Sequence, residues 1–499
     1  MGTAQLLDRR TAGKRLLSLF SATAVAFAAS VAFVTGAAPA AADPIERCTP
    51  TVGAIVAVDF GPFGGGVVRG CDTTPTTGYE LLRDGGFTTE GTRRTLLVGD
   101  PCYDELLGSA DRAASYRRAL GVPGRHRLVV LSSTWGPTSL IGQDPGLAAR
   151  VLAALPYDEF RVAAIVHPNV WSGHGSWQIR NLLAPALDAG LMLVPHVHAW
   201  RSALVAADVV VGDHGSVTLY GAALGKPVLL GTYGSEAVPG TAVAALGRAA
   251  PRLDVHGDVR EQIVSALATQ RPEQFATVAE GAFDRPGQAL PRLRTALYDL
   301  LGLAEPVPAP PQERFLAEPE ETGTRVTSWT VTTTAAPDAV TVRRQPAAVS
   351  RHGEDGPGEI GPGEDAAAGR FRHLACDERE PDRRVLESAS VLLRGAPAPS
   401  APVGLGWIDE TLDRLPGCRL AATALAGGGF LVGLRDGRVV EAAMTGPVTD
   451  PGLPATAVYS LLRAGAPLDD ATVALRAGAR DEDVVLRLRT SSSPDSAPR

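Results

Sequence analysis

The sequence predicts an α/β protein: a Rossmann-like parallel sheet over residues 93–302, followed by a smaller α/β module. Three observations support this. Short apolar runs alternate with segments of helical periodicity, as in strands joined by crossover helices. The runs are continuously apolar, as expected for strands buried on both faces. Several runs also end in Ser, His, Asp or Gly, the residues that form turns and helix caps.

The expected elements follow in chain order. The predicted strands are "RRTLLVGD", "RHRLVVLSS", "FRVAAIVHP", "LMLVPH", "DVVVGD" and "PVLLGTY". Between them, helical spacing is found in "PCYDELLGSADRAASYRRALG", "DPGLAARVLAAL", the segment near Trp177 to Ala189, "WRSALVAA" and "SVTLYGAAL". Strand and helix thus alternate through the whole segment, which predicts parallel pairing.

The chain changes composition after residue 302. Residues 303–369 are rich in Pro, Gly and Glu and are expected to be a disordered linker, although "TRVTSWTVTTT" within them could form a hairpin strand. Residues 370–490 are expected to form a small α/β accessory domain, in which Asp436-Gly437 marks a hairpin turn. This module has no catalytic constellation, and residues 491–499 read as a disordered tail.

The N-terminus has the features of a secretory leader. Basic residues precede the apolar run "LLSLFSATAVAFAASVAFV", and small residues follow it, which predicts a signal peptide over residues 1–42. The run is also long enough for an uncleaved membrane anchor. Residues 43–92 form a small Gly-rich fragment of the kind seen in small secreted actinobacterial proteins, in which Cys48 and Cys71 could pair. The formal net charge of −7 argues against a nucleic-acid surface.

The run "ADVVVGDHGSVTLYGAALGKPVLL" carries the strongest functional signal. Its strand ends at "GDHGS", where Gly215 allows close backbone approach and Ser216 can cap the next helix. Any strand-to-helix turn favours such residues, but three other strand ends carry "SSTWGP", "HPN" and "PHVH". Because ligands bind at the carboxyl edge of parallel sheets, we expect these groups to form one phosphate-binding rim.

These motifs resemble a known family. "VVLSSTWGP", "AAIVHPN" and "AADVVVGDHGSVTLYGAALGKPVLL" are similar, in order, to the donor-side half of the CDP-glycerol glycerophosphotransferases, which polymerise teichoic acids. The "GKPV" ending also occurs in other enzymes with the GT-B fold, including nucleotide-sugar epimerases. The resemblance implies half of a GT-B fold and extends to uncharacterised actinobacterial proteins. It also implies transfer from a nucleotide-activated donor, CDP-glycerol or a nucleotide sugar, to a cell-wall acceptor.

The resemblance assigns a role to each matching residue. His167 matches the histidine of the transfer chemistry, as general base or as a contact to the donor phosphate. The donor-phosphate loop corresponds to Asp213, His214, Gly215 and Ser216, although the family has Tyr where His214 stands. The loop that faces the nucleotide corresponds to Ser133, Thr134 and Trp135.

No cofactor or metal is expected. A zinc site is the less favoured alternative, because none of the candidate ligands His167, His174, His196 and His198 lie four residues apart on a helix. The family activity would lie at the cytoplasmic membrane face, whereas the leader predicts export or anchoring. We therefore also expect two alternatives: a non-catalytic nucleotide- or phosphate-binding protein, or an inactive fusion or truncation that lacks the acceptor-side half.

Overall fold

The computed structural model describes residues 54–59, 67–73, 96–307, 314–320, 322–336, 338–350 and 369–489. It divides into two compact units, residues 1–97 and 98–499. In the first, β1 (Ala54–Asp59) and β2 (Val67–Asp72) form an antiparallel pair. Cys71 is disulfide-bonded, while its predicted partner Cys48 and the predicted leader lie outside the described residues.

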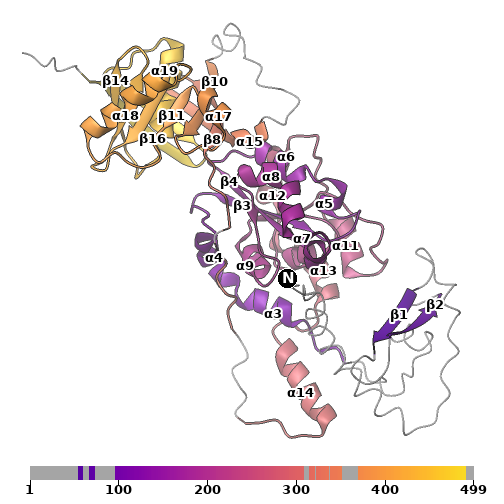
Figure 1. Cartoon of the computed structure of the whole chain (residues 1–499). Helices are drawn as coiled ribbons and strands as arrows, with labels where there is room; N and C mark the ends of the chain where they lie inside the picture. Colours follow the sequence, from indigo (N-terminus) through magenta and orange to yellow (C-terminus); the bar gives the residue numbers. More distant parts are fainter. Residues whose placement is uncertain are drawn as a thin grey trace, which may run out of the picture. The chain divides into compact units, whose positions relative to one another are not determined.

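The second unit contains a five-stranded parallel sheet, which confirms the Rossmann-like prediction (Figure 1). Its strands are β3 (Arg127–Ser133), β4 (Phe160–Val166), β5 (Met192–Leu193), β6 (Val209–Gly212) and β7 (Val228–Leu230). Their spatial order is β5-β4-β3-β6-β7, and every pair is parallel. The chain therefore moves to one side of β3 first and to the other side at β6, so the strand order reverses between β3 and β6.

The prediction of a first strand at "RRTLLVGD" is wrong for the residues that the structure describes. Its described residues, 96–100, carry no strand. Gly99 adopts a left-handed backbone with φ 99°, and Asp100 caps the helix that follows by accepting from the Tyr103 N–H at 3.0 Å. A strand cannot continue through this turn, because the backbone has already left the extended region.

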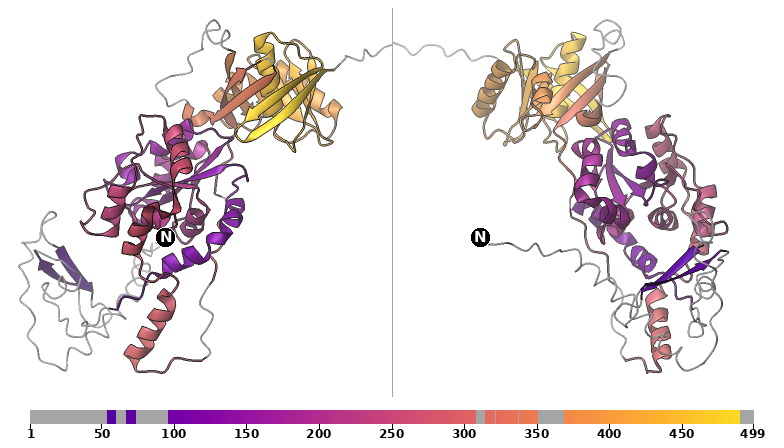
Figure 2. Two further views of the ribbon diagram at one scale, coloured as in Figure 1. Left: turned by 180° about the vertical axis from the view of Figure 1, so that it is seen from behind. Right: turned by 45° about the vertical axis from the view of Figure 1, so that its right-hand side comes forward.

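Helices cover both faces of the sheet, as the two views in Figure 2 show. Successive strand residues point to opposite faces, so Val129 and Leu131 enter one apolar core while Leu128 and Val130 enter the other. This arrangement explains the continuous apolar runs of the strands. The helices of this domain are α3 (Pro101–Gly108), α4 (Ala113–Ala119), α5 (Leu140–Gln143), α6 (Leu147–Ala154), α7 (Pro168–Leu182), α8 (Ala184–Asp188), α9 (Ala199–Ala206), α10 (Ser216–Ala223), α11 (Ala242–Ala249), α12 (Val259–Thr269) and α13 (Ala276–Ala282). A further helix, α14 (Ala289–Leu301), contacts α3 and extends away from the sheet (Figure 1).

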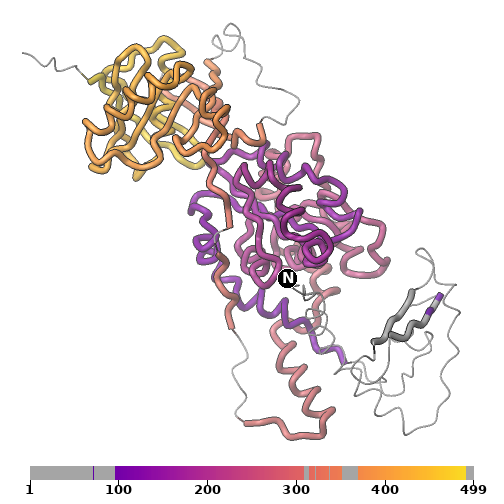
Figure 3. The backbone as a smooth tube through the Cα atoms, viewed as in Figure 1, coloured from indigo at the N-terminus to yellow at the C-terminus, as the bar shows by residue number. Residues whose placement is uncertain are grey.

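The C-terminal module is a closed nine-stranded barrel, whose backbone can be followed in Figure 3. The strand order is β10-β11-β12-β13-β14-β16-β15-β9-β8, with β8 also paired to β10. The barrel strands are β8 (Ser328–Ala335), β9 (Ala339–Pro346), β10 (Arg370–Asp377), β11 (Val391–Leu393), β12 (Leu420–Ala424), β13 (Phe430–Leu434), β14 (Val439–Met444), β15 (Ala471–Ala477) and β16 (Arg480–Leu488). The Asp436-Gly437 hairpin joins β13 to β14, with Gly437 at φ 88°.

The barrel begins inside the segment predicted as linker. β8 and β9 lie within residues 303–369 and pair with each other and with β10 and β15. Their alternating burial shows why they fold as strands, since Val331, Val340 and Val342 face the core between exposed or half-buried polar residues. β8 matches the hairpin strand expected in "TRVTSWTVTTT", whereas β9 was not predicted. The module is thus a barrel that starts before residue 370.

A helix runs against the inner face of the barrel. In α19 (Gly452–Ala464), every residue from Gly452 to Leu461 is buried, and its apolar side chains share one core with the strands. Two further helices, α17 (Arg383–Ser388) and α18 (Ala401–Arg414), pack a second core against the other side of β10 to β13. α15 (Ala347–Ser350) follows β9.

Among the described residues, no helix is long and apolar enough to span a bilayer.

Candidate functional site

A cavity of about 210 Å³ lies at the carboxyl edge of the parallel sheet. It is where the strand order reverses between β3 and β6, the position at which open α/β sheets bind ligands. The wall comes from the ends of β3 and β4, from the starts of α7 and α10, and from the segment that joins β5 to α9. Its lining residues are Ser132, Ser133, Thr134, Ile165, Val166, His167, Pro168, His196, Trp200, Gly215, Ser216 and Val217.

The N-terminus of α10 opens onto this cavity without a side-chain cap. Gly215 is the N-cap residue, with extended backbone, and no side chain caps the first turn. Ser216, the first helical residue, is exposed, and Ser216 and Val217 both line the cavity. An uncapped helix N-terminus presents free N–H groups and a partial positive charge to the solvent. The cavity therefore offers an anion-binding wall at the position predicted from "GDHGS".

Asp213 holds the backbone of this site together and does not line the cavity. It is fully buried, and its carboxylate accepts from the N–H groups of Thr134 and Leu140, both at 2.8 Å, and Gly215 at 2.9 Å. Burial raises the pKa of Asp213, while these three hydrogen bonds act in the opposite direction. Asp213 was predicted to bind the donor phosphate, but in the structure it fixes the segments after β3 and β6 relative to each other.

His167 is the N-cap residue of α7, and this role determines its tautomer. Its Nδ1 accepts from the Asn169 N–H at 3.1 Å, so the proton of the neutral ring is on Nε2. Desolvation lowers the pKa of His167, which favours the neutral ring, while Asp213 acts in the opposite direction. Nε2–H is therefore the group that His167 can offer to a ligand, and it is a donor.

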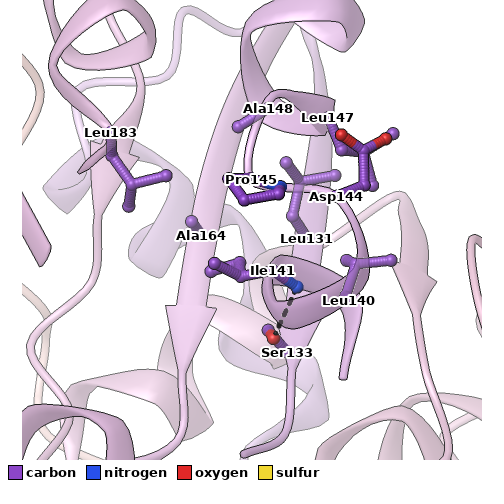
Figure 4. Close-up of a pocket in the computed structure, with 10 residues that line it drawn as sticks. All are labelled: Leu131, Ser133, Leu140, Ile141, Asp144, Pro145, Leu147, Ala148, Ala164 and Leu183. Carbon is purple, nitrogen blue, oxygen red and sulfur yellow. Dashed lines mark hydrogen bonds between the residues drawn. The ribbon is translucent and has the colours of Figure 1, made fainter. Parts of the chain in front are cut away.

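The loop after β3 contributes two of its three predicted residues to the cavity. Ser133 and Thr134 line it, whereas Trp135 does not and is 57% exposed. The hydroxyl of Ser133 accepts from the Ile141 N–H at 3.1 Å and donates to the Thr134 carbonyl at 3.1 Å. Figure 4 shows Ser133 directed at Ile141 beside a small apolar pocket of about 10 Å³. Ser133 thus anchors α5, and Thr134 is the freer hydroxyl.

His214 turns toward a neighbouring loop. Its Nδ1 accepts from the Gly234 N–H at 3.0 Å, and its Nε2 lies 3.8 Å from a carboxylate oxygen of Glu236. The other carboxylate oxygen of Glu236 accepts from the hydroxyl of Thr138. His214 therefore ties the loop after β7 to the loops after β3 and β6, and it does not line the cavity.

Two aromatic residues of the cavity come from the segment after β5: His196 belongs to the strand end "PHVH" that was expected at this rim, whereas Trp200 was not predicted. His196 and Trp200 both line the wall, and the His196 ring stacks on Trp171 with centroids 5.0 Å apart. Trp171 is itself held by a hydrogen bond from its Nε1 to the Val166 carbonyl at 3.1 Å. The motif "PHVH" marks the strand end, but only the packing of α7 against it shows which histidine faces the cavity.

No metal centre is apparent in the described part of the chain, where no three His, Cys, Asp or Glu side chains gather as a metal site requires. The candidate zinc ligand His198 instead contacts Arg201 at 2.9 Å. His174 lies just before a break in α7 at Gly175, which has φ 78°.

No protein-family model matches the chain, and no curated protein matches it. Solved structures do match. UDP-GlcNAc 2-epimerase from Neisseria meningitidis, bound to UDP-GlcNAc, is 16% identical with a TM-score of 0.28, over 41% of this chain and 54% of that chain. The wall teichoic acid polymerase TagF is 14% identical with a TM-score of 0.31, over 45% and 55%. A glycosyltransferase from Rickettsia africae is 13% identical with a TM-score of 0.28, over 45% and 61%.

The chain spans between 54% and 61% of the length of these three structures.

Proposed function

We propose that the α/β domain binds the diphosphate of a nucleotide-activated donor and acts as a transferase of the glycerophosphotransferase or glycosyltransferase type. CDP-glycerol or a nucleotide sugar is the donor. The observation that carries this proposal is the uncapped N-terminus of α10, which opens onto the cavity between β3 and β6. The family resemblance of the motifs supplies the donor class, and the geometry supplies the anion site.

His167 serves this reaction as a hydrogen-bond donor. Because Nδ1 is engaged with the Asn169 N–H, Nε2–H is available for an oxygen of the donor diphosphate. Transfer leaves additional negative charge on the departing nucleotide, which is CMP when glycerol phosphate is transferred from CDP-glycerol and a nucleoside diphosphate when a sugar is transferred. A hydrogen-bond donor placed at that phosphate stabilises the transition state more than the ground state. Of the two roles that the resemblance left open, the capping geometry favours the phosphate contact.

The variant Ser216→Asp tests the anion site, because it should move binding and stability in opposite directions. A carboxylate in the first turn of α10 interacts favourably with the helix dipole, by about 0.3–1 kcal/mol. The same charge repels a diphosphate, and like charges brought together cost several kcal/mol, so we expect affinity for CDP-glycerol, CDP or UDP-sugars to fall about 100-fold or more. Calorimetry and thermal unfolding measure the two effects.

Ser216→Asn is the matched control, since it has nearly the same shape and no charge. It should keep most of the nucleotide affinity. Equal binding by the wild type and Ser216→Asp, or no binding of any of these nucleotides by the wild type, would contradict the proposed function.

His167→Asn separates the two roles of the histidine. Asparagine is a favourable N-cap residue, so α7 should remain capped and thermal stability should change little. The donor at Nε2 is lost, and a hydrogen bond to a charged group contributes about 1.5–3 kcal/mol. We therefore expect nucleotide affinity to fall by roughly 10- to 100-fold in calorimetry. Unchanged affinity with abolished turnover would instead assign His167 as the general base.

A second candidate function is non-catalytic binding of the same ligand. One observation favours it: no Asp or Glu is among the residues that line the cavity, so the described wall provides no carboxylate base. Turnover of the donor in the presence of cell-wall acceptors distinguishes the two functions. Tight nucleotide binding with no turnover under any acceptor would support the binding protein.

A further inference from the structure

A second hollow lies at the amino edge of the parallel sheet, opposite the candidate site. Arg127, Asp208 and Lys226 are among its lining residues, and they are respectively the first residue of β3, the residue before β6 and a residue two positions before β7. Because parallel strands share one direction, their amino ends form the edge away from the candidate site. This hollow has a volume of about 520 Å³.

Positive charge dominates this hollow. Arg117, Arg125, Arg127 and Lys226 line it, whereas Asp208 is its one carboxylate. We call these five residues and their cavity the basic hollow. Such an excess of cations is notable in a chain whose formal net charge is −7. Clustered charge of one sign in a concave surface raises the local concentration of ligands of opposite sign.

Lys226 and Arg117 form the floor of the basic hollow, where hydrogen bonds and an ion pair hold them in place. The Nζ of Lys226 donates to the carbonyls of Val205 at 2.9 Å and Ala207 at 2.8 Å, at the C-terminal end of α9. Arg117 forms an ion pair with Asp208, whose carboxylate also accepts from the Leu128 N–H at 2.7 Å. The carboxylate of Asp208 thus compensates one positive charge, while Lys226 is held by neutral carbonyls.

The other two cations lie at the rim with little compensation. The side chain of Arg127 is 61% exposed and reaches Asp208 only at 3.4 Å, on a carboxylate already paired with Arg117. Arg125 is exposed and forms no ion pair with any described residue. A guanidinium group has a planar set of donors that matches the oxygens of a phosphate group.

The remaining wall is made of small residues, which keep the hollow open. They are Ala113, Ala114, Gly124, Ala206, Ala207 and Ala479, with His126 beside them. Side chains of this size leave space for a ligand between the cationic floor and rim.

We propose that the basic hollow is an anion-binding site for a small phosphorylated molecule that carries at least two negative charges. Four cations against one carboxylate favour a multiply charged ligand, and the arginine pair favours phosphate over a single carboxylate. The site is separate from the candidate donor site at the opposite edge of the sheet.

Calorimetry of the full-length chain with inorganic pyrophosphate tests this proposal, with Ser216→Asp as the background. That substitution blocks the donor site, so the remaining binding reports the basic hollow. We expect Ser216→Asp to retain one binding event. Adding Arg125→Gln and Arg127→Gln should weaken that event at least tenfold. Arg118→Gln, on the exposed side of the same helix as Arg117, is the matched control and should leave it unchanged.

Each outcome has a separate meaning. Loss of all pyrophosphate binding in Ser216→Asp alone overturns the basic hollow and leaves the proposed function in place. Equal affinity before and after the two arginine substitutions overturns it as well. If Ser216→Asp binds pyrophosphate as the wild type does, and the variant that also carries Arg125→Gln and Arg127→Gln does not bind it, the proposed donor site is wrong and the basic hollow is supported. Binding of an acidic peptide such as polyglutamate, without pyrophosphate binding, also overturns the phosphate proposal.

Discussion

Asp158→Asn is expected to lower the free energy of unfolding by about 3–5 kcal/mol, because it leaves a buried guanidinium without its main counter-ion. Arg344 on β9 is 5% exposed, and its Nε donates to Asp158 at 2.9 Å. Asp158 is also buried, in the turn between α6 and β4, and its pKa is lowered by Arg344 against the opposing effect of desolvation. The pair joins the barrel to the α/β domain.

Neighbouring contacts cannot replace this carboxylate. Asp450 receives a hydrogen bond from Nη1 of Arg344 at 2.6 Å, but its side chain is 40% exposed and compensates a buried charge less well. The Tyr157 N–H donates to the Arg344 carbonyl at 2.7 Å and would remain. Urea unfolding measures the change. The control Asp436→Asn breaks the exposed pair with Arg438 and should cost at most about 1 kcal/mol. Similar effects of both substitutions would contradict the assignment.

Acidification should destabilise the protein well before its carboxylates are protonated. Burial lowers the pKa of His126 to about 4 and that of His373 to about 3. Both lie below the value of roughly 6.5 for an unfolded chain. As the pH falls below 6.5, the unfolded state takes up protons that the folded state does not, so stability is lost from there down to the folded pKa values.

Each histidine contributes at most about 1.4 kcal/mol per pH unit. Because this slope develops gradually around each pKa, the two together should cost roughly 5–6 kcal/mol between pH 6.5 and pH 4. Neither ring nitrogen of His373 has a hydrogen-bond partner, and its ring lies 4.2 Å from that of Tyr459 on α19. His373→Leu should therefore change stability little at pH 7 and should reduce the slope of stability against pH by about half. Urea unfolding across this pH range checks both expectations. An unchanged slope in the variant would show that His373 does not titrate as proposed.

Much of the α/β domain could be predicted because local pattern and tertiary structure agree there. The strands β3, β4 and β6 are continuous apolar runs, and the segments that follow them contribute residues to one cavity, as parallel pairing requires. His167, Gly215 and Ser216 were predicted from such strand ends. The barrel was not predicted as a barrel, because β8 and β9 lie between segments of linker-like composition and close the sheet only through long-range pairing.

The direction in which each side chain points could not be predicted from the sequence. "GDHGS" contains four candidate phosphate ligands, yet Asp213 binds three backbone N–H groups and His214 contacts the Gly234 loop. Thr134 lies in the loop after β3 and Leu140 begins α5, so these contacts depend on which strand lies next to β6.

The sequence by itself determined the alternation of strands and helices, the parallel sheet and the strand ends at which polar groups gather, because these follow from hydrophobic periodicity and turn chemistry along the chain. Only the tertiary structure decided which groups line the cavity, where the barrel closes and where the cations of Arg117, Arg125, Arg127 and Lys226 meet. Those features depend on strand order and on contacts between residues far apart in the chain, and local propensity does not encode them.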